Sequence, residues 1–330
     1  MTEPVILAGD IGGTNTRLCL YQVRDAEVVE LRGQSYASQS VKSLDEIVRR
    51  FMSEGPPVRI GVAALAVAGP VVDGRCVATN LPWVLEEAIL AEAAKVAHLR
   101  LLNDLQALAF GVLFLPKHQL VSLNGLGPPG RGAAAVIAVG TGLGQAYLHW
   151  DGARYHPAPS EGSHGEFGPQ NEVQLELSRY LIHRFGHPST ERVISGPGFS
   201  LIYDFLVQSG REKAPPELEN ELKTGDRNAI ISAHGVKGRY DICARVMDIF
   251  VDCFGAEAGN VALRGFATGG LYIGGGVVPK ILPRLQDGRF VRAFESKGRF
   301  RDFLSRIALS VVTQEGTGLL GSAHYARLML

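Results

Sequence analysis

One stretch near the start of the chain, residues 6–20, constrains the fold more than any other. An apolar run reaches Asp10, turns through Gly12 and Gly13, and leaves as a second apolar run. Two such runs around a Gly-Gly pair predict two strands joined by a hairpin turn. Glycine has no Cβ, so backbone N–H groups of this turn could approach a phosphate. Asp10 could hold Mg2+ through water, although a surface hairpin with a turn-favouring Asp explains the stretch equally well.

The overall composition is that of a packed protein with room for two domains. The chain has 330 residues, of which 46% are hydrophobic and 20% are charged. The 33 basic residues balance the 33 acidic ones, so no basic field indicates nucleic acid or an anionic membrane as a partner. The longest apolar run, residues 61–72, is too short to cross a bilayer.

The cysteines and the N-terminal residues indicate a cytoplasmic protein. Cysteines stand at positions 19, 76, 243 and 253 without a CxxC pair, which predicts neither a disulfide framework nor a zinc site. Reduced thiols in the cytoplasm fit this spacing best. The chain begins without a basic segment and reaches Gly9-Asp10 after four apolar residues, so no signal peptide is expected.

Apolar periodicity and turn residues predict alternating strands and helices in the first third of the chain. Ser43 followed by Glu46 is a capping-box pattern, so a helix is expected to begin there. This alternation indicates a mixed sheet covered by helices. The expected strands are 5–10, 16–23, 28–35, 58–67 and 99–102, and the expected helices are 43–55, 84–97 and 105–113.

The opening pattern recurs about 130 residues later, which we interpret as a weak duplication of a whole domain. Residues 135–139 lead through Gly140-Thr141-Gly142-Leu143-Gly144 into a second apolar segment, 145–148. Beyond residue 172 the chain is expected to be mostly helical. The expected elements there are two helices separated by Gly196-Pro197-Gly198, a long helix at 240–264, a strand at 267–273, a helix starting at Pro279 and a last helix at 315–329.

Three glycine-rich turns, at 12–13, 140–144 and 269–276, each follow a predicted strand. None is a dinucleotide fingerprint, because Gln145 stands where the third glycine would be, and no Gly-Lys-Ser/Thr of a Walker A loop occurs. Three such turns in two similar halves, with Asp10 at a strand end, resemble the superfamily of sugar kinases, actin and Hsp70. That resemblance implies a nucleotide bound in a cleft between two similar domains.

Polar residues in apolar surroundings form a second group of candidates. Each has a simpler explanation by itself: Asp104 could cap a helix, the loop 159–167 could be an exposed turn, and Glu191 could compensate a helix dipole. Together they suit a neutral polyol, because carboxylates accept hydrogen bonds from hydroxyl groups, whereas Asn both donates and accepts. A site built in this way rejects analogues that lack the hydroxyl groups.

Seven motifs, in order over essentially the whole chain, resemble the bacterial glucokinase family. They are Gly9-Asp10-Ile11-Gly12-Gly13-Thr14-Asn15, Asn103-Asp104, Gly140-Thr141-Gly142-Leu143-Gly144, Glu161-Gly162-Ser163-His164, Glu191-Arg192-Val193-Ile194-Ser195-Gly196-Pro197-Gly198, Gly269-Gly270-Leu271-Tyr272-Ile273-Gly274-Gly275-Gly276-Val277 and Phe294-Glu295-Ser296-Lys297-Gly298-Arg299-Phe300.

The resemblance implies an α/β fold of two duplicated actin-like, ribonuclease H-like domains, with mixed sheets flanked by helices and the active-site cleft between them. The small domain would take residues 1–113 and 307–330, and the large domain 114–306. It implies a cytoplasmic glucokinase that uses ATP and Mg2+ to phosphorylate the 6-hydroxyl of D-glucose, the first step of glycolysis. A homodimer formed by the helices after residue 172 is also expected, with no nucleic acid or membrane as partner.

The same resemblance assigns the site residues. Asp104 would be the catalytic base, and it would bind glucose together with Asn103, Glu161, His164 and Glu191. Asp10 would also hold Mg2+ through water. The residues that would face the nucleotide are Gly9, Asp10, Gly12, Gly13, Thr14, Asn15, Gly140, Thr141, Gly142, Gly274 and Gly275.

Two positions depart from the family pattern, and both concern fine specificity. Ser163 stands where Gly is expected in Glu-Gly-Gly-His, and Thr16 stands where Ala is expected. The zinc-binding Cys-x-Cys-Gly cluster of ROK glucokinases is missing, and no helix-turn-helix extension is seen, which argues against a ROK-type repressor. The alternative functions are a kinase for another hexose such as mannose or fructose, a catalytically silent sugar-binding regulator, and an actin-like or chaperone ATPase.

Overall fold

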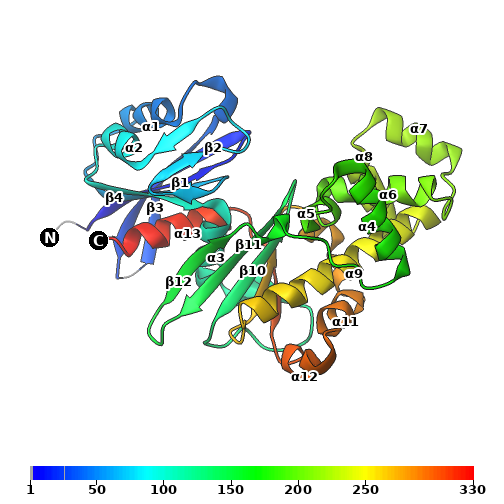
Figure 1. The fold of residues 1–330 in the computed structure, drawn as a ribbon. Helices are drawn as coiled ribbons and strands as arrows, with labels where there is room; N and C mark the ends of the chain where they lie inside the picture. The colour runs from blue at the N-terminus through cyan, green and yellow to red at the C-terminus, as the bar shows by residue number, and fades with distance from the viewer. Residues whose placement is uncertain (1–2, 26) are drawn as a thin grey trace. The chain divides into compact units, whose positions relative to one another are not determined.

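The computed structural model describes residues 3–25 and 27–330, and its internal contacts divide the chain into two units. Unit 1 comprises the described residues up to Pro116, together with Tyr155–Pro159 and Gln314–Leu330. Unit 2 comprises Lys117–Arg154 and Ser160–Thr313. Each unit has its own sheet, and Figure 1 shows each sheet with the helices that accompany it.

Unit 1 contains a five-stranded sheet with the order β3-β2-β1-β4-β8 and a small sheet with the order β5-β6-β7. Strand β1 runs antiparallel to β2 and parallel to β4, and β4 runs parallel to β8. The strands are β1 (Val5–Ile11), β2 (Asn15–Arg24), β3 (Glu27–Ala37), β4 (Ile60–Val67), β5 (Val71–Val72), β6 (Arg75–Val77), β7 (Val84–Glu86) and β8 (His98–Asn103). The helices are η1 (Ser38–Ser40), α1 (Leu44–Ser53), α2 (Glu87–Ala94), α3 (Asp104–Gly111), η2 (Val112–Phe114) and α13 (Thr317–Arg327).

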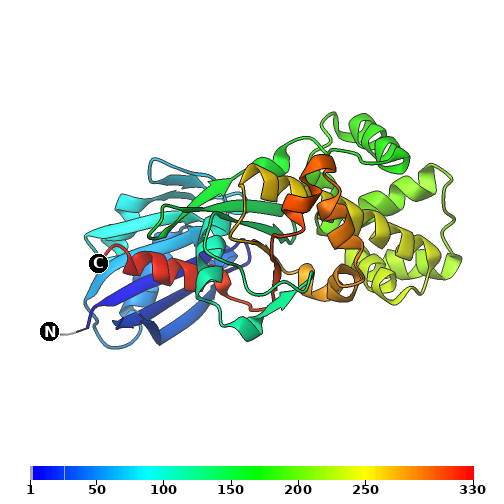
Figure 2. The same ribbon diagram turned by 90° about the horizontal axis from the view of Figure 1, so that it is seen from below.

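Both faces of β1 are buried. Leu7 and Ile11 lie in a core that also includes residues of α1 and α2, whereas Ile6 and Ala8 lie in a second core with residues of α3 and α13. Figure 2 shows α13, in red, lying along the blue strands of this unit. Since side chains alternate along a strand, Asp10 shares the face of Ile6 and Ala8.

Small residues allow α13 to pack closely in unit 1. A Cβ added to Gly321 would collide with the carbonyl oxygen of Ala107 in α3, and one added to Gly111 would collide with that of Thr317. The Ser322 hydroxyl donates a hydrogen bond of 3.1 Å to the carbonyl oxygen of Gly9 in β1. The C-terminal helix therefore completes the sheet that carries the N-terminal hairpin.

The second large sheet has the order β12-β11-β10-β13-β14-β9. Its strands belong to unit 2 except for β12, of which Tyr155–Pro159 are grouped with unit 1. The strands are β9 (Leu120–Ser122), β10 (Ala134–Val139), β11 (Leu143–Trp150), β12 (Tyr155–Ser160), β13 (Leu271–Gly274) and β14 (Leu309–Val312). The helices are η3 (Lys117–Gln119), η4 (Gly162–His164), α4 (Glu172–Phe185), α5 (Thr190–Val193), α6 (Gly196–Gln208), α7 (Pro216–Thr224), α8 (Arg227–Lys237), α9 (Asp241–Arg264), η5 (Val278–Ile281), α10 (Leu282–Leu285), α11 (Arg289–Glu295), η6 (Gly298–Phe300) and α12 (Arg301–Leu304).

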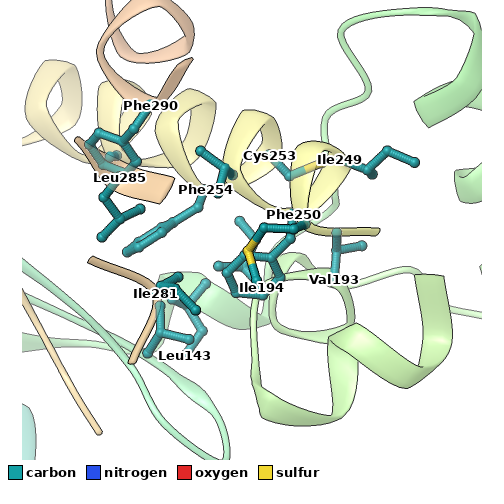
Figure 3. Packing of buried hydrophobic residues seen from close by; sticks show 14 of the residues in the cluster. Leu143, Val193, Ile194, Ile249, Phe250, Cys253, Phe254, Ile281, Leu285 and Phe290 are labelled. Atoms are coloured by element: carbon teal, nitrogen blue, oxygen red, sulfur yellow. The ribbon is translucent and has the colours of Figure 1, made fainter. Parts of the chain in front are cut away.

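The 24-residue helix α9 forms the centre of the core of unit 2 (Figure 3). A helix with apolar residues on most of its circumference is typically buried on all sides. Phe250 stacks on Phe199 with ring centroids 4.2 Å apart, and Phe254 meets the edge of Phe290 at 5.0 Å. Burial of side chains of this size contributes roughly 1.5–3 kcal/mol each, so α9 holds the surrounding helices in place.

The order β11-β10-β13-β14 in unit 2 repeats the order β2-β1-β4-β8 in unit 1. In each case one hairpin is followed by two parallel neighbours. The predicted α/β fold with mixed sheets flanked by helices is therefore confirmed. Strand β14 belongs to the second sheet, so the chain returns to unit 1 after it, at Gln314.

Several local predictions were only partly right. Ser43 occupies the N-cap position of α1, but its side chain makes no capping hydrogen bond. Residues 84–86 form β7, paired with β6, so α2 begins three residues later than predicted. Gly196-Pro197-Gly198 forms the first turn of α6 rather than the break before it. Strand β13 begins only at Leu271, because the backbone N–H of Gly269 bonds to Ala133 and Gly270 has a φ of +111°.

Residues 3–25 and 27–330 contain no helix with both the length and the apolar character that a membrane crossing requires.

The contact between α13 and α3 predicts that one glycine-to-alanine substitution in a helix lowers the free energy of unfolding instead of raising it. Alanine normally favours a helix over glycine by about 1 kcal/mol. Gly321→Ala is nevertheless expected to lower the free energy of unfolding by about 1–3 kcal/mol, because the added methyl group overlaps the Ala107 carbonyl oxygen. Urea denaturation measures the effect. Gly130→Ala, at a loop position with no atom within 4 Å of the added Cβ, is the control and should change stability little; equal losses in both variants would contradict the packing argument.

Candidate active site

The turn between β1 and β2 is held in shape by a residue that the sequence analysis did not single out. Ser38 donates from its backbone N–H to the Thr14 carbonyl oxygen at 2.8 Å and from its hydroxyl to that of Gly12 at 2.7 Å. The hydroxyl of buried Thr16 lies 3.0 Å from the Ser38 hydroxyl. The Gly12 N–H also donates to the Asn15 carbonyl oxygen at 2.9 Å. Thr14 and Asn15 remain exposed at the tip of the turn.

The departure at Thr16 is explained by this arrangement. A hydroxyl group that points into a core needs a hydrogen-bond partner, and Ser38 is that partner, 22 residues further along the chain. Thr16 was therefore the signal from which Ser38 could have been found. Gly13 is needed for a different reason, since an added Cβ would lie 2.8 Å from the Cβ of Asn80.

Asp10 lies at the carboxyl end of β1, half-buried and beside the first turn of α13. A Cβ added to Gly318 would be 3.6 Å from its Oδ2 atom. Burial raises the pKa of Asp10, and the charge of Arg17 opposes this shift. A single carboxylate next to a glycine turn fits the way proteins hold hydrated Mg2+ beside a phosphate group. Gly9, by contrast, lies within β1, where Leu18 and Leu65 leave no room for a Cβ.

Asn103 and Asp104 lie at the same edge of the sheet as the β1 turn. The strand register aligns Ile11 of β1 with Val67 of β4, and Val67 with Asn103 of β8. Adjacent strands are about 4.8 Å apart, so the ends of β1 and β8 are separated by one strand. Unit 1 thus brings together the candidate phosphate turn and the candidate base.

Asn103 caps helix α3, and Asp104 does not. The Asn103 Oδ1 atom accepts from the backbone N–H groups of Leu105 at 3.0 Å and Gln106 at 3.3 Å, while its Nδ2 donates to Gly69. Asp104 is the first helical residue, and its Oδ1 accepts from the Leu105 N–H at 2.9 Å. The simpler explanation of Asp104 as the N-cap is therefore wrong.

In unit 2 the turns at 140–142 and 274–275 follow the neighbouring parallel strands β10 and β13. The Val277 N–H donates to the carbonyl oxygen of Val139, the last residue of β10, at 3.0 Å. Gly275 has a φ of +93°, and an added Cβ there would collide with the Val139 backbone. Gly275 is required both by its conformation and by this close approach.

Glu161, His164 and Glu191 come together in unit 2. The His164 Nε2 atom is 3.6 Å from a Glu161 oxygen, and its Nδ1 atom is 3.9 Å from a Glu191 oxygen. The side chains of Glu161 and His164 are 56% and 59% exposed, and that of Glu191 is 32% exposed. Two carboxylates and an imidazole are thus presented at the surface as a group of hydrogen-bonding side chains.

Two segments joined by backbone bonds build this cluster. The Thr190 N–H donates to the Gly165 carbonyl oxygen at 2.9 Å, and the Phe167 N–H donates to that of Pro188 at 2.8 Å. The His187 Nε2 atom lies 2.7 Å from the His164 carbonyl oxygen. Because these bonds fix the loop after His164 against α5, residues 30 positions apart reach one cluster.

Glu191 also belongs to the glycine turn after β10. Its Oε2 atom accepts a hydrogen bond of 2.9 Å from the Leu143 N–H, directly after Gly142. Leu143, Val193 and Ile194 are buried around α9 (Figure 3). The apolar core therefore fixes both ends of this hydrogen bond.

This contact leads to a prediction for the protein without ligands. A Cβ on Gly142 would lie 2.5 Å from the Glu191 Oε2 atom, so Gly142→Ala should break the bond to Leu143 and lower the unfolding free energy by about 1–2 kcal/mol. Thermal or urea unfolding measures the loss. Gly140→Ala adds the same methyl group in the same turn with no atom within 4 Å, so it should be better tolerated. If the two variants were equally stable, the contact with Glu191 would not limit position 142.

Comparisons with known proteins show which family the chain resembles. The family model described as Glucokinase matches residues 7–329. A glucokinase from Synechocystis sp. is 37% identical to this chain, in an alignment that covers 96% of each protein. The crystal structure of a glucokinase from an Antarctic psychrotroph has a TM-score of 0.84 at 31% identity, over 98% of this chain and 99% of that one.

A more distant solved structure shares the fold alone. A ROK family glucokinase from Streptomyces griseus, solved in complex with glucose and AMPPNP, has a TM-score of 0.64 at 18% identity and covers 98% of this chain and 99% of that one. The duplicated sheets, the full-length family match and the relatives above 30% identity lead to one conclusion: the chain belongs to the glucokinase family of sugar kinases.

Proposed function

We propose that this member of the glucokinase family transfers the γ-phosphoryl group of ATP to the 6-hydroxyl of D-glucose, giving glucose 6-phosphate and ADP. The observation that carries the proposal is the cluster of Glu161, His164 and Glu191, with neighbouring side chains 3.6 and 3.9 Å apart. An exposed group of acceptors suits a ligand that offers several adjacent hydroxyl groups. Family membership favours glucose as that ligand.

In this proposal, Glu161, His164 and Glu191 bind sugar hydroxyl groups, and Asn103 adds a further contact through its amide. The carboxylates accept hydrogen bonds, and the imidazole donates from one ring nitrogen and accepts at the other. A sugar that lacks one of these hydroxyl groups would leave a protein group unpaired, which is the physical basis for discrimination between hexoses.

Asp104 acts as the base that accepts the proton of the 6-hydroxyl. Two contacts support this role: Asn103 caps α3, so the Asp104 side chain is not the helix cap, and the Leu105 N–H orients one of its oxygens at 2.9 Å. An oriented base within reach of the hydroxyl proton contributes about 10²–10⁴ to the rate. Most of the remaining acceleration in phosphoryl transfer comes from positioning.

The glycine turns hold the nucleotide. Gly12, Gly13, Thr14 and Asn15 in unit 1, and the turns at 140–142 and 274–275 in unit 2, offer backbone N–H groups without an obstructing Cβ. Asp10 holds Mg2+ through water beside the first of these turns. When bound, Mg2+ neutralises charge that develops on the transferring phosphoryl group.

The direct test is ADP release from Mg-ATP with glucose, mannose, fructose, N-acetylglucosamine or no sugar. We expect turnover with glucose far above all others. Turnover with another hexose instead would support a sugar kinase but reject glucose as its substrate. ADP release at the same rate with and without sugar would indicate an ATPase. Complete lack of release would favour a sugar-binding regulator.

One substitution tests the base. Asp104→Asn should lower kcat by roughly 10²–10⁴ because the amide cannot accept the proton, while the Kd for glucose should change only a few-fold. Rapid-quench turnover and calorimetric titration measure the two quantities. Asp302→Asn, at an exposed position of α12, is the matched control and should keep full kcat. Near-normal kcat in the Asp104 variant would place the base elsewhere.

We also propose a cytoplasmic homodimer that acts at the entry of glucose into glycolysis. The four cysteines are buried and unpaired, as expected in a reducing compartment. Leu175 and Ile182 lie seven residues apart on α4 and are 36% and 47% exposed, and Val207 of α6 is 37% exposed. Exposed apolar side chains on one helix face commonly mark a protein interface.

The proposed homodimer can be tested with one substitution on α4. Ile182→Asp should shift the protein from dimer to monomer in sedimentation equilibrium, because a charge at a buried apolar contact is strongly unfavourable. Val29→Asp, at an exposed apolar position of β3, is the control and should leave the mass unchanged. A wild-type protein that sediments as a monomer would reject the homodimer itself.

A further inference from the structure

Gln145 is a buried polar residue that neither the fold nor the proposed chemistry explains. It lies in β11, with an exposed fraction of 0%, two residues after Leu143. A buried side-chain amide is costly unless its polar atoms are paired. The residues that Gln145 contacts therefore show why a polar group stands in this strand.

One end of the Gln145 amide is held by helix α9. Its Nε2 atom donates a hydrogen bond of 2.9 Å to Glu257, which is itself only 6% exposed. Asn260 and Arg264, one and two turns further along α9, also donate to the Glu257 carboxylate, at 2.8 and 2.9 Å. Glu257 is thereby fixed in position and compensated by a positive charge.

The orientation of the amide follows from this contact. A carboxylate only accepts hydrogen bonds, so the nitrogen of Gln145 must face Glu257 and the oxygen must face the other way. The Gln145 Oε1 atom is buried and accepts no hydrogen bond within the described part of the chain. It points at Gly162, where an added Cβ would lie only 2.8 Å from it.

Gly162 lies between Glu161 and His164, in the short helix η4. The first half of the loop around it has only short-range bonds: the Gly162 N–H donates to the Ser160 hydroxyl at 3.1 Å, and the His164 N–H donates to the Glu161 carbonyl oxygen at 3.1 Å. The other end of the loop is held by Thr190 and His187, which bond to the carbonyl oxygens of Gly165 and His164. The contact with Gln145 connects this loop to the rigid pair of β11 and α9.

We propose that Gln145 is a positioning residue for the sugar loop, residues 160–165: held by Glu257, it sets the position of Gly162 and so places Glu161 and His164. This inference rests on the proposed function for the ligand of the loop. Strand β11 then supports the whole cluster, because the Leu143 N–H holds Glu191 and the Gln145 side chain holds the loop with Glu161 and His164.

The test compares two substitutions of buried glutamines by methionine, which conserves volume and removes the polar atoms. Gln145→Met should raise the KM for glucose roughly tenfold, since small displacements of binding groups are costly. The KM for ATP should change less than about twofold and kcat less than about threefold. Gln174→Met is the matched control: Gln174 is 2% exposed in α4, and its side-chain oxygen accepts from the Gln170 N–H at 2.8 Å, outside the sugar loop.

A second readout does not depend on activity. Hydrogen exchange of the Gly162, His164 and Gly165 amides should become faster in Gln145→Met and stay unchanged in Gln174→Met. If wild-type protein does not phosphorylate glucose, the proposed function fails, and the exchange measurement still decides whether Gln145 orders the loop. Unchanged exchange together with an unchanged KM for glucose would overturn the inference, as would an equal rise in KM in the control variant.

A paired exchange checks the role of Glu257. Gln145→Glu alone places two carboxylates side by side in a buried environment and should raise the KM for glucose at least as much as the methionine variant. Adding Glu257→Gln to it restores one amide–carboxylate pair and should recover part of the loss. Absence of any recovery, with both proteins folded by circular dichroism, would argue against the connection through Glu257.

Discussion

The constraint on which the rest of this structure depends is the burial of both faces of strands β1 and β10. Ile6 and Ala8 pack on one face of β1 and Leu7 and Ile11 on the other, and all six residues of β10 are buried. When a strand of such a mixed sheet is buried on both faces, its ends are the places where polar groups can meet a ligand. The candidate site residues Asp10, Asn103 and Gly140 all stand at such ends.

Much of this fold and of the candidate site could be predicted from local sequence patterns. The hairpin at residues 6–20 and its counterpart at 135–148 were predicted because each combines period-two apolar runs with glycine turns. The long helix was predicted at 240–264 and observed at 241–264. The polar motifs could be found because they interrupt apolar sequence, but their roles came from the resemblance to a family and not from spacing.

Features that depend on distant partners could not be predicted from local pattern. The Ser38 hydroxyl donates to the Gly12 carbonyl oxygen in a turn much earlier in the sequence, and Gln145 pairs with a carboxylate 112 residues away. The short strand β7 forms because β6 is available to pair with it, although its sequence is compatible with a helix. At Ser43 the capping pattern was present and the capping bond was not, since local propensity is only one of several competing terms.

The two carboxylates of the sugar cluster differ in how far the protein orients them before a ligand arrives. Glu191 has one oxygen fixed by the Leu143 N–H at 2.9 Å, so its other oxygen is directed toward His164. The conformational entropy of the Glu191 side chain is lost on folding and need not be lost again when a ligand binds. Glu161 is more exposed, and the His164 Nε2 atom is 3.6 Å from one of its carboxylate oxygens. The orientation of Glu161 therefore depends on the position of the loop backbone. The buried amide of Gln145, next to Gly162, acts on Glu161 through that backbone.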